Sequence, residues 1–375
     1  MKIINTTLLF FFVFSFVSCV KEDETLPFYT SKGAYDSGVL VLNSGSDGSQ
    51  NASLSYISFD LNTTKNNIFS LENGVSLGER ANDIGFYEDL AYVVVYGSDK
   101  IEIVNRYTLK KIKTITTGLL NPRYVEFYNG KGYVTCWGEE SSSTDDYVSV
   151  INLSTNEVIK SIPVVEGPEN LVQYNGKIYV SHTGGLNQNN KVSIVNTTND
   201  VLDGSPITVG NVPNKLAVYN GDLWIFCTGN PDFAVGGETP AKIVKMNLTT
   251  NVVSTFKTFS ASTNYANMII YDSYIYYTYN NIVYKEIIVQ TNPATSAKSL
   301  NTNIDNLYGL GVKNNYIYVS GYSTELGYDS NGTVKIYANG DRTETDGSGN
   351  LVNPFGKLLK TTTVGIGPNG FYFNQ

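Results

Sequence analysis

The sequence predicts an all-β fold, a seven-bladed β-propeller of four-stranded blades, from three observations. The first is a turn motif that recurs along the chain, as "YED" at Tyr87, "YNG" at Tyr128, Tyr174 and Tyr219, "YDS" at Tyr271 and "KNN" at Lys313. Successive copies lie 41, 46, 45, 52 and 42 residues apart, a period typical of propellers. The second is the lack of a long amphipathic helical period, which predicts almost no helix. The third is that the two ends of the chain supply complementary parts of one further repeat.

Each repeat predicts four strands. The second copy reads "YVEFY", "GYVTCW", "YVSVINL" and "EVIKSIPV" between Tyr124 and Val164. The Asn-Gly pairs between the first two strands are typical of tight hairpins. Polar and apolar residues alternate imperfectly along these strands. That pattern fits sheets that pack face to face and bury both sides of most strands.

The last blade is predicted to come from both ends of the chain. The sequence ends in "GPNGFYFNQ", which matches the first strand of a repeat and then stops. Residues 38–69 contain "VLVLN", "SLSYISFDL" and "NNIF", which match strands two to four. Six internal repeats and one closing blade make seven, within a single domain over residues 38–375, and the shared blade removes a free sheet edge. Six or eight blades remain open if residues 285–306 hold a different arrangement.

The N-terminus carries an apolar run, "LLFFFVFSFVSC", that follows Lys2, ends at Cys19 and is too short to span a bilayer. It resembles a bacterial lipoprotein signal peptide, with Phe16 in place of the usual Leu of the lipobox. The resemblance implies cleavage after residues 1–18, lipidation of Cys19 and a flexible tether over residues 19–37. "VKEDE" after the cysteine resembles the export signal of Bacteroidota lipoproteins, which implies a lipid-anchored protein on the outer face of the outer membrane. The alternative is an ordinary secretory signal with an incidental cysteine.

Charge and residue usage exclude several functions. The net charge is -8, from 26 Lys and Arg against 34 Asp and Glu, so nucleic acid is not an expected partner and the membrane is contacted through the lipid anchor only. With His182 as the single histidine, we expect no multi-histidine metal centre, no cofactor and no catalytic triad. His182 is instead expected at the rim, in a structural or ligand-contact role. "DGSGN" at residues 346–350 lacks the acidic spacing of a calcium loop.

Cys136 and Cys227 occupy the same position, the end of the second strand, in two blades that are not neighbours. We therefore expect them to be too far apart for a disulfide. Both are predicted to be buried or half-buried thiols.

Ligands of propellers usually bind at one mouth of the central channel, where loops entering the first strands and loops between the second and third strands converge. The pairs aligned at the start of the first strands are Asn82-Asp83, Arg123-Tyr124, Glu169-Asn170, Asn214-Lys215, Ala266-Asn267, Tyr308-Gly309 and Pro368-Asn369. Asn recurs in five blades, and its amide can bind amide, phosphate or hydroxyl groups without a net charge. The alternative is that these Asn residues cap turns.

The loops after the second strands are long and aromatic in several blades. Trp137, Phe233, Tyr322 and Tyr328 are expected to be exposed there and to present flat surfaces to a ringed ligand. The predicted ligand-binding residues are therefore Asn82, Asp83, Arg123, Tyr124, Trp137, Asn170, His182, Asn214, Lys215, Asn267, Tyr308, Tyr322 and Asn369.

The repeat resembles the YVTN-type β-propeller family, through "VSVINLSTNEVIKSIPV" and "VSIVNTTNDVLDGSPITVG". Together with the N-terminus, the chain is similar to the cobalamin-capturing surface lipoproteins that cap TonB-dependent vitamin transporters in Bacteroidota. This resemblance implies a corrinoid held over the channel mouth by Asn, Tyr and Trp side chains and passed to such a transporter. Two alternatives stay open: an adhesin or protein/glycan interaction module, and an enzyme such as a lyase or a quinone-dependent dehydrogenase.

Overall fold

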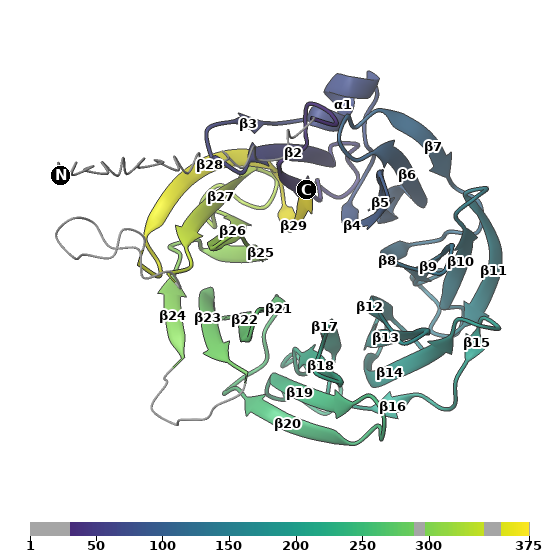
Figure 1. Cartoon of the computed structure of the whole chain (residues 1–375). Helices are drawn as coiled ribbons and strands as arrows, with labels where there is room; N and C mark the ends of the chain where they lie inside the picture. Colours follow the sequence, from purple (N-terminus) through teal and green to yellow (C-terminus); the bar gives the residue numbers. More distant parts are fainter. Residues whose placement is uncertain (1–30, 289–296, 341–353, 375) are drawn as a thin grey trace, which may run out of the picture. The chain divides into compact units, whose positions relative to one another are not determined.

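The computed structural model describes residues 31–288, 297–340 and 354–374. Lys32–Gln375 form a compact unit, the second of the two into which the chain divides. The second unit confirms the predicted fold class, because its strands form seven antiparallel blades of four strands around a ring (Figure 1). Residues 285–306, the segment that left the blade number open, include the end of β23 (Ile282–Ile287) and all of β24 (Lys298–Asn301), which belong to one four-stranded blade. Among the described residues, no helix has the length and apolar character needed to cross a membrane.

The first strand of every blade faces the ring axis and the second lies behind it (Figure 1). The first strands are β29 (Pro368–Asn374), β4 (Ala81–Tyr87), β8 (Pro122–Tyr128), β12 (Pro168–Tyr174), β17 (Pro213–Tyr219), β21 (Met268–Tyr271) and β25 (Asn306–Lys313). The second strands are β1 (Gly38–Asn43), β5 (Leu90–Val95), β9 (Lys131–Cys136), β13 (Lys177–Gly184), β18 (Asp222–Cys227), β22 (Tyr274–Tyr279) and β26 (Tyr316–Tyr322).

The third and fourth strands complete each blade towards the perimeter. The third strands are β2 (Ser53–Ser58), β6 (Lys100–Asn105), β10 (Tyr147–Asn152), β14 (Gln188–Asn196), β19 (Lys242–Asn247), β23 (Ile282–Ile287) and β27 (Asn331–Ala338). The fourth are β3 (Thr64–Lys65), β7 (Lys111–Ile115), β11 (Glu157–Pro163), the pair β15 (Val201–Leu202) and β16 (Ile207–Thr208), β20 (Val253–Thr258), β24 (Lys298–Asn301) and β28 (Leu358–Ile366).

The closing blade contains both ends of the propeller, as predicted. Its strand order is β29-β1-β2-β3, and β1 pairs with β29 so that Gly38 faces Asn374 and Val41 faces Phe371. The expected fourth strand at "NNIF" is wrong. Asn67 takes a left-handed backbone conformation (φ 55°) that ends the extended chain, and Ile68–Asn73 form helix α1, whose Ile68 and Phe69 are buried in the core. The fourth strand is instead the two-residue β3.

The predicted hairpins between first and second strands are present. In two of them the turn pairs Asn129-Gly130 and Asn175-Gly176 have φ values of 50° and 74°, and of 47° and 73°. Positive φ at both central residues is the type I′ geometry that matches the twist of the flanking strands, and Asn-Gly adopts it at little cost. These hairpins lie at one face of the propeller, which we call the hairpin face. The opposite face, where the first strands begin, is the mouth face.

The core lies between neighbouring blades, so the middle strands are buried on both sides. One cluster joins Tyr92 and Val94 of β5 to Val125 and Val134 of the next blade. Cys136 and Cys227 are buried and unpaired, as expected, and burial raises the pKa of each thiol to about 12, so neither is reactive at neutral pH.

The folded unit begins at Lys32 rather than at Gly38, the boundary expected from sequence. Tyr35 is buried, and its N–H donates to the Tyr107 carbonyl at 2.9 Å. Lys32 pairs with Asp89, in the β4–β5 hairpin, at 3.0 Å. The chain therefore enters the propeller at the hairpin face. Cys19 and the "DGSGN" segment at 346–350 lie outside the described residues.

Candidate functional site

A β-bulge opens the first strand of six blades, at the pairs singled out in the sequence. In β8, Pro122 faces Cys136 and Val125 faces Val134, so Arg123 and Tyr124 together oppose one residue. The same shift occurs in β29, β4, β12, β17 and β25. Successive residues of a regular strand point to opposite faces, whereas a bulge re-aims one of them. Both members of a pair can therefore reach the channel.

The bulge also corrects the pair predicted for the closing blade. Pro368 faces Asn43 at the position where Pro122 faces Cys136, so the equivalent pair is Asn369-Gly370, one residue later than expected. Pro368 therefore corresponds to Pro122, the proline that precedes the pair Arg123-Tyr124 in its blade, and is not itself a member of the pair. Asn still recurs in five blades, but at two different positions of the bulge.

One pocket at the mouth face is lined by residues of all seven blades. We call it the mouth pocket; its volume is about 250 Å³. It brings together eight of the predicted residues, which are Asn82, Arg123, Tyr124, Asn214, Lys215, Asn267, Tyr308 and Asn369. Glu169, Asn264, Tyr265, Ala266 and Tyr372 complete the lining. Amides, hydroxyls and charged groups from distant parts of the chain thus meet in one place.

A second pocket of about 310 Å³, the channel pocket, lies farther along the first strands. It contains the predicted residues Asp83 and Asn170 and shares Tyr124 with the mouth pocket. Asp83 accepts hydrogen bonds from the Val125 N–H and the Tyr372 hydroxyl, each at 3.0 Å. Burial raises the pKa of Asp83, and it also raises the pKa of Glu126. Neither carboxyl group is therefore as acidic as it would be in water.

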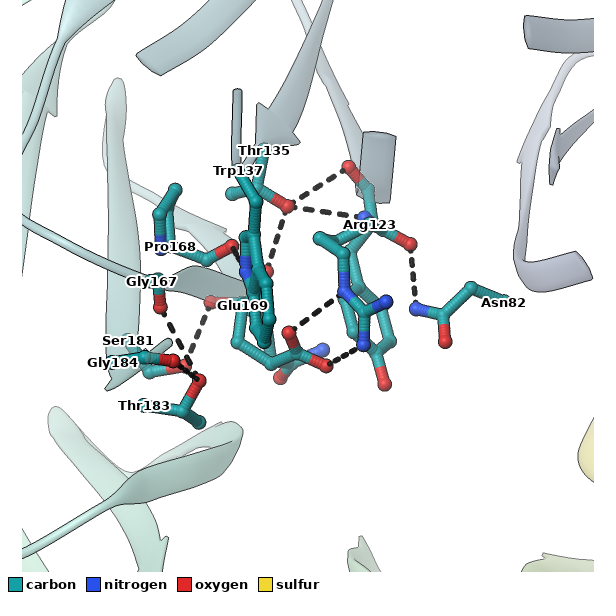
Figure 2. Close-up of polar contacts among 12 residues, drawn as sticks. Asn82, Arg123, Thr135, Trp137, Gly167, Pro168, Glu169, Ser181, Thr183 and Gly184 are labelled. Atoms are coloured by element: carbon teal, nitrogen blue, oxygen red, sulfur yellow. Dashed lines mark hydrogen bonds and ion pairs between the residues drawn. The ribbon is translucent and has the colours of Figure 1, made fainter. Parts of the chain in front are cut away.

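Arg123 and Glu169 form a bidentate ion pair at the wall of the mouth pocket (Figure 2). The two N–H···O distances are 3.0 and 3.1 Å, and the side chains are only 15% and 6% exposed. The guanidinium carbon lies 4.6 Å from the ring centroids of both Tyr96 and Trp137. Trp137 donates its indole N–H to the Pro168 carbonyl at 3.0 Å. Its contact with the site is therefore the packing of its ring against the Arg123 guanidinium.

Four of the recurring Asn side chains tie neighbouring blades together. Asn82, Asn267 and Asn369 donate to backbone carbonyls of the next blade at 2.7, 3.3 and 3.2 Å. Asn170 accepts from the Leu216 N–H at 2.9 Å. These side chains therefore bond to groups of the neighbouring blade, whereas the turn-capping alternative predicted bonds within their own turns. Asn214 differs, because it has no hydrogen bond within the part of the chain that the structure describes.

Four tyrosines border the mouth pocket and form what we call the aromatic cluster, namely Tyr265, Tyr308, Tyr322 and Tyr328. The ring centroids of Tyr265 and Tyr308, and those of Tyr322 and Tyr328, are 5.1 Å apart and packed edge to face. The hydroxyls of Tyr265 and Tyr322 lie 3.2 Å apart. Trp137, Tyr322 and Tyr328 are half-buried rather than exposed as expected, while Phe233 is 83% exposed on its loop.

His182 does not lie at the rim. It is fully buried in β13, where its Nε2 lies 2.8 Å from the Ser193 hydroxyl, and it lines neither pocket. Cys136 and Cys227, which align with His182, are buried as well. The side chain at this position packs between neighbouring blades, and the exposed loop begins only after it. Desolvation lowers the pKa of His182 from 6.5 to about 4, so it is neutral in the folded protein.

The buried His182 predicts a pH dependence of stability. Its contribution is complete above pH 6.5 and is lost as the pH falls towards 4, because the unfolded chain then binds a proton that the folded chain does not. In His182→Gln this loss disappears. We expect the difference in unfolding free energy between wild type and variant to change by up to about 1.4 kcal/mol per pH unit in that range. Urea unfolding of both proteins from pH 7 to 4.5 measures it; a constant difference would contradict a neutral buried His182.

Sequence reasoning missed Tyr96, Glu169, Tyr265 and Tyr372 as site residues. Tyr96 follows Val95 as Trp137 follows Cys136, so the strand alignment could have found it. Glu169 stood in an aligned pair, but its partner Arg123 is in another blade. No local sequence pattern marks Tyr265 or Tyr372 as a residue of the site. Within the described ranges, no three or more His, Cys, Asp or Glu residues come together as a metal site.

Comparisons with known proteins identify the family. The model of a family described as "Domain of unknown function (DUF5074)" matches residues 37–339, so the chain belongs to this family. Curated proteins give no match.

Solved structures resemble the propeller at low sequence identity. They include a hypothetical selenium-binding protein from Sulfolobus tokodaii (TM-score 0.60, 11% identity, 92% of this chain and 97% of that chain). A putative 6-phosphogluconolactonase from Bacteroides uniformis (0.55, 11%, 88% and 100%) and hydrazine synthase of Kuenenia stuttgartiensis (0.56, 16%, 77% and 88%) are similar too. At these identities the likeness shows the propeller fold alone.

Proposed function

We propose that this DUF5074 protein binds a nutrient ligand at its mouth pocket and delivers it to a TonB-dependent transporter of the outer membrane. The observation that carries the proposal is the pocket itself, to which all seven blades contribute. A ring of amide, hydroxyl and cationic groups around one hollow can hold several polar groups of a ligand at once. Binding rather than catalysis fits the site, because Arg123 and Glu169 are engaged with each other.

The candidate ligand is a corrinoid. A pocket of about 250 Å³ is smaller than the roughly 300–1,000 Å³ of pockets that enclose a drug-sized molecule. A macrocycle would therefore lie over the mouth, against the aromatic cluster and Trp137, with one polar arm inside. Corrinoids have this form, since amide-bearing arms surround a large ring, and the Asn side chains of the pocket can pair with amides.

The proposed location is the cell exterior, with the protein held at the outer membrane by lipid on Cys19. Support for a protein partner comes from exposed apolar side chains on the loops between second and third strands. These are Leu186, Phe233, Val235 and Leu326, with Phe233 and Val235 83% and 98% exposed. The loops belong to the mouth face, so a transporter that closes over the mouth would contact them.

The same loop tips favour a second candidate function, a protein or glycan interaction module at the cell surface. In that case the apolar tips, and not the mouth pocket, would carry the binding. The two functions differ in whether a small molecule binds to the isolated protein.

An absorbance titration and a thermal-shift series with cyanocobalamin test the proposal. We expect saturable binding, with stabilisation of about 2.7 kcal/mol when the free ligand is 100-fold above its Kd. Haem and a set of glycans are tested in parallel. If haem or a glycan stabilises the protein and corrinoids do not, the ligand is that molecule and not a corrinoid. If no small molecule binds, the interaction module is favoured.

Two Asn variants separate binding from stability. Asn214→Ala removes an amide without hydrogen bonds in the described structure, so we expect weaker cyanocobalamin binding and an unchanged melting temperature. Asn82→Ala is the comparison for stability, because it removes the 2.7 Å bond to the Arg123 carbonyl and is expected to lower stability by about 1 kcal/mol. Wild-type affinity in Asn214→Ala would contradict binding in the mouth pocket.

A further inference from the structure

Lys215 is the one charged side chain of the mouth pocket without an oppositely charged partner among the described residues. Arg123 and Glu169 neutralise each other through their two hydrogen bonds. The Lys215 Nζ donates to the Tyr124 hydroxyl at 2.6 Å and lies 4.7 Å from the centroid of that ring. An ammonium group has three N–H donors. Two donors are therefore left for a group that enters the pocket.

The lining of the mouth pocket has a surplus of one positive charge. Arg123 and Lys215 carry two positive charges and Glu169 one negative charge, and the other lining residues are neutral. Asp83, in the channel pocket, is the carboxyl group that could offset this surplus. Its oxygens already accept hydrogen bonds from the Val125 N–H and the Tyr372 hydroxyl, and it forms no ion pair with Lys215.

Lys215 remains charged where it lies. Burial acts to lower its pKa, but Tyr124 and then Glu169 and Asp83 act more strongly in the other direction, and the net shift is upward. A half-buried ammonium that forms no ion pair adds little to the stability of a fold. A role in stability therefore does not explain this lysine.

Two neutral donors lie in the same pocket. Asn214 is the other member of the Lys215 bulge, and its amide makes no hydrogen bond to a described residue. The Tyr308 hydroxyl also has no hydrogen-bond partner in the ranges described, and burial raises its pKa well above the ordinary value, so it stays protonated and can donate. An ammonium, an amide and a hydroxyl are a suitable set for anionic oxygens.

We propose that the mouth pocket binds a singly charged anionic group of the ligand, a phosphodiester or a carboxylate, on the ammonium of Lys215. This rests on the proposed function, because the group belongs to the molecule captured at the mouth. The charge surplus of one selects a monoanion, and the small volume admits the anionic arm rather than the whole ligand.

The test uses small probes on the full chain. We expect dimethyl phosphate or acetate to bind saturably in the millimolar range by calorimetry, and neutral trimethyl phosphate not to bind. Preference for dimethyl phosphate assigns a phosphodiester, and preference for acetate assigns a carboxylate. Binding should weaken at least about tenfold in Lys215→Met, because a charge-assisted hydrogen bond is lost. The matched control is Lys110→Met, which removes an exposed lysine of the β6–β7 turn and is expected to bind like wild type.

The outcomes separate this proposal from the capture of corrinoids. Cobalamin carries one phosphodiester and cobinamide has none, so Lys215→Met should weaken cyanocobalamin binding and leave cobinamide binding unchanged. Equal binding of cyanocobalamin to wild type and to Lys215→Met would overturn the binding of a phosphodiester on Lys215 and leave capture standing. Binding of dimethyl phosphate without any corrinoid binding would overturn the capture of corrinoids and leave the anion subsite standing. Failure of wild type to bind either anion would overturn the subsite directly.

Folding of the variant is a separate check. Because Lys215→Met replaces a half-buried ammonium that has no ion pair among the described residues with an apolar chain, we expect a melting temperature equal to or above that of wild type. Lys215→Arg keeps the charge and is expected to retain anion binding. Loss of binding in Lys215→Arg together with a lower melting temperature in Lys215→Met would assign Lys215 a structural role instead.

Discussion

Ending the chain at Ile366 is expected to abolish the folded monomer, because this removes β29, the first strand of the closing blade. Without β29, β1 becomes an open edge, and the buried Val39 and Val41 lose the neighbours Phe371 and Phe373. Each large apolar side chain contributes about 1.5–3 kcal/mol when buried. The buried Phe371, the half-buried Tyr372 and Phe373 and a row of backbone hydrogen bonds together account for a large part of the stability of a domain, about 5–15 kcal/mol.

Urea unfolding and size-exclusion chromatography measure this effect. A synthetic peptide of residues 367–374, added to the shortened chain, should restore part of the cooperative transition by refilling the edge. Phe371→Ala is a milder variant, and we expect a loss of about 3 kcal/mol because Phe371 packs on Tyr318 at a centroid distance of 5.7 Å. A shortened chain that unfolds at the wild-type midpoint would contradict closure by β29.

Replacing Glu169 with Ala is expected to lower the unfolding free energy by about 3 kcal/mol. The change leaves the Arg123 guanidinium buried between Tyr96 and Trp137 without its counter-ion, and an uncompensated buried charge costs about 3–5 kcal/mol. Burial acts against the charge on Arg123, and Glu169 offsets this and holds the pKa of Arg123 above its ordinary value. Chemical denaturation at neutral pH provides the measurement.

An exposed ion pair serves as the control. Lys177 and Asp203 lie 2.8 Å apart with both side chains 41% exposed, so Asp203→Ala should cost about 1 kcal/mol or less. The double variant Arg123→Met/Glu169→Met should recover most of the loss, since apolar residues can replace a buried pair. Equal losses in Glu169→Ala and Asp203→Ala would mean that water screens the pair in the mouth pocket.

Most of the fold could be predicted because the sequence repeats its own structural unit. The Asn-Gly hairpins set the spacing, and "GPNGFYFNQ" at one end complements "VLVLN" at the other. The error at α1 has a local cause. "NNIF" resembles a strand in composition, but the left-handed Asn67 and the burial of two successive residues, Ile68 and Phe69, favour a helical turn.

The site could be predicted only as far as the repeat aligns it. Counting from the hairpins placed eight residues in the mouth pocket, but it did not reveal the bulges that make both members of a pair face the channel. The pairing of Arg123 with Glu169 joins two blades 46 residues apart, and no local pattern encodes it. The prediction for His182 failed in a different way. A polar residue next to a loop was expected at the rim, but its side chain is part of the core.

The entry of the chain beside Asp89 and the mouth pocket lie on opposite faces of the propeller. A tag or a support attached ahead of Lys32 therefore joins the propeller away from the side at which a ligand would enter, so the protein can be immobilised through its N-terminal end without covering the pocket.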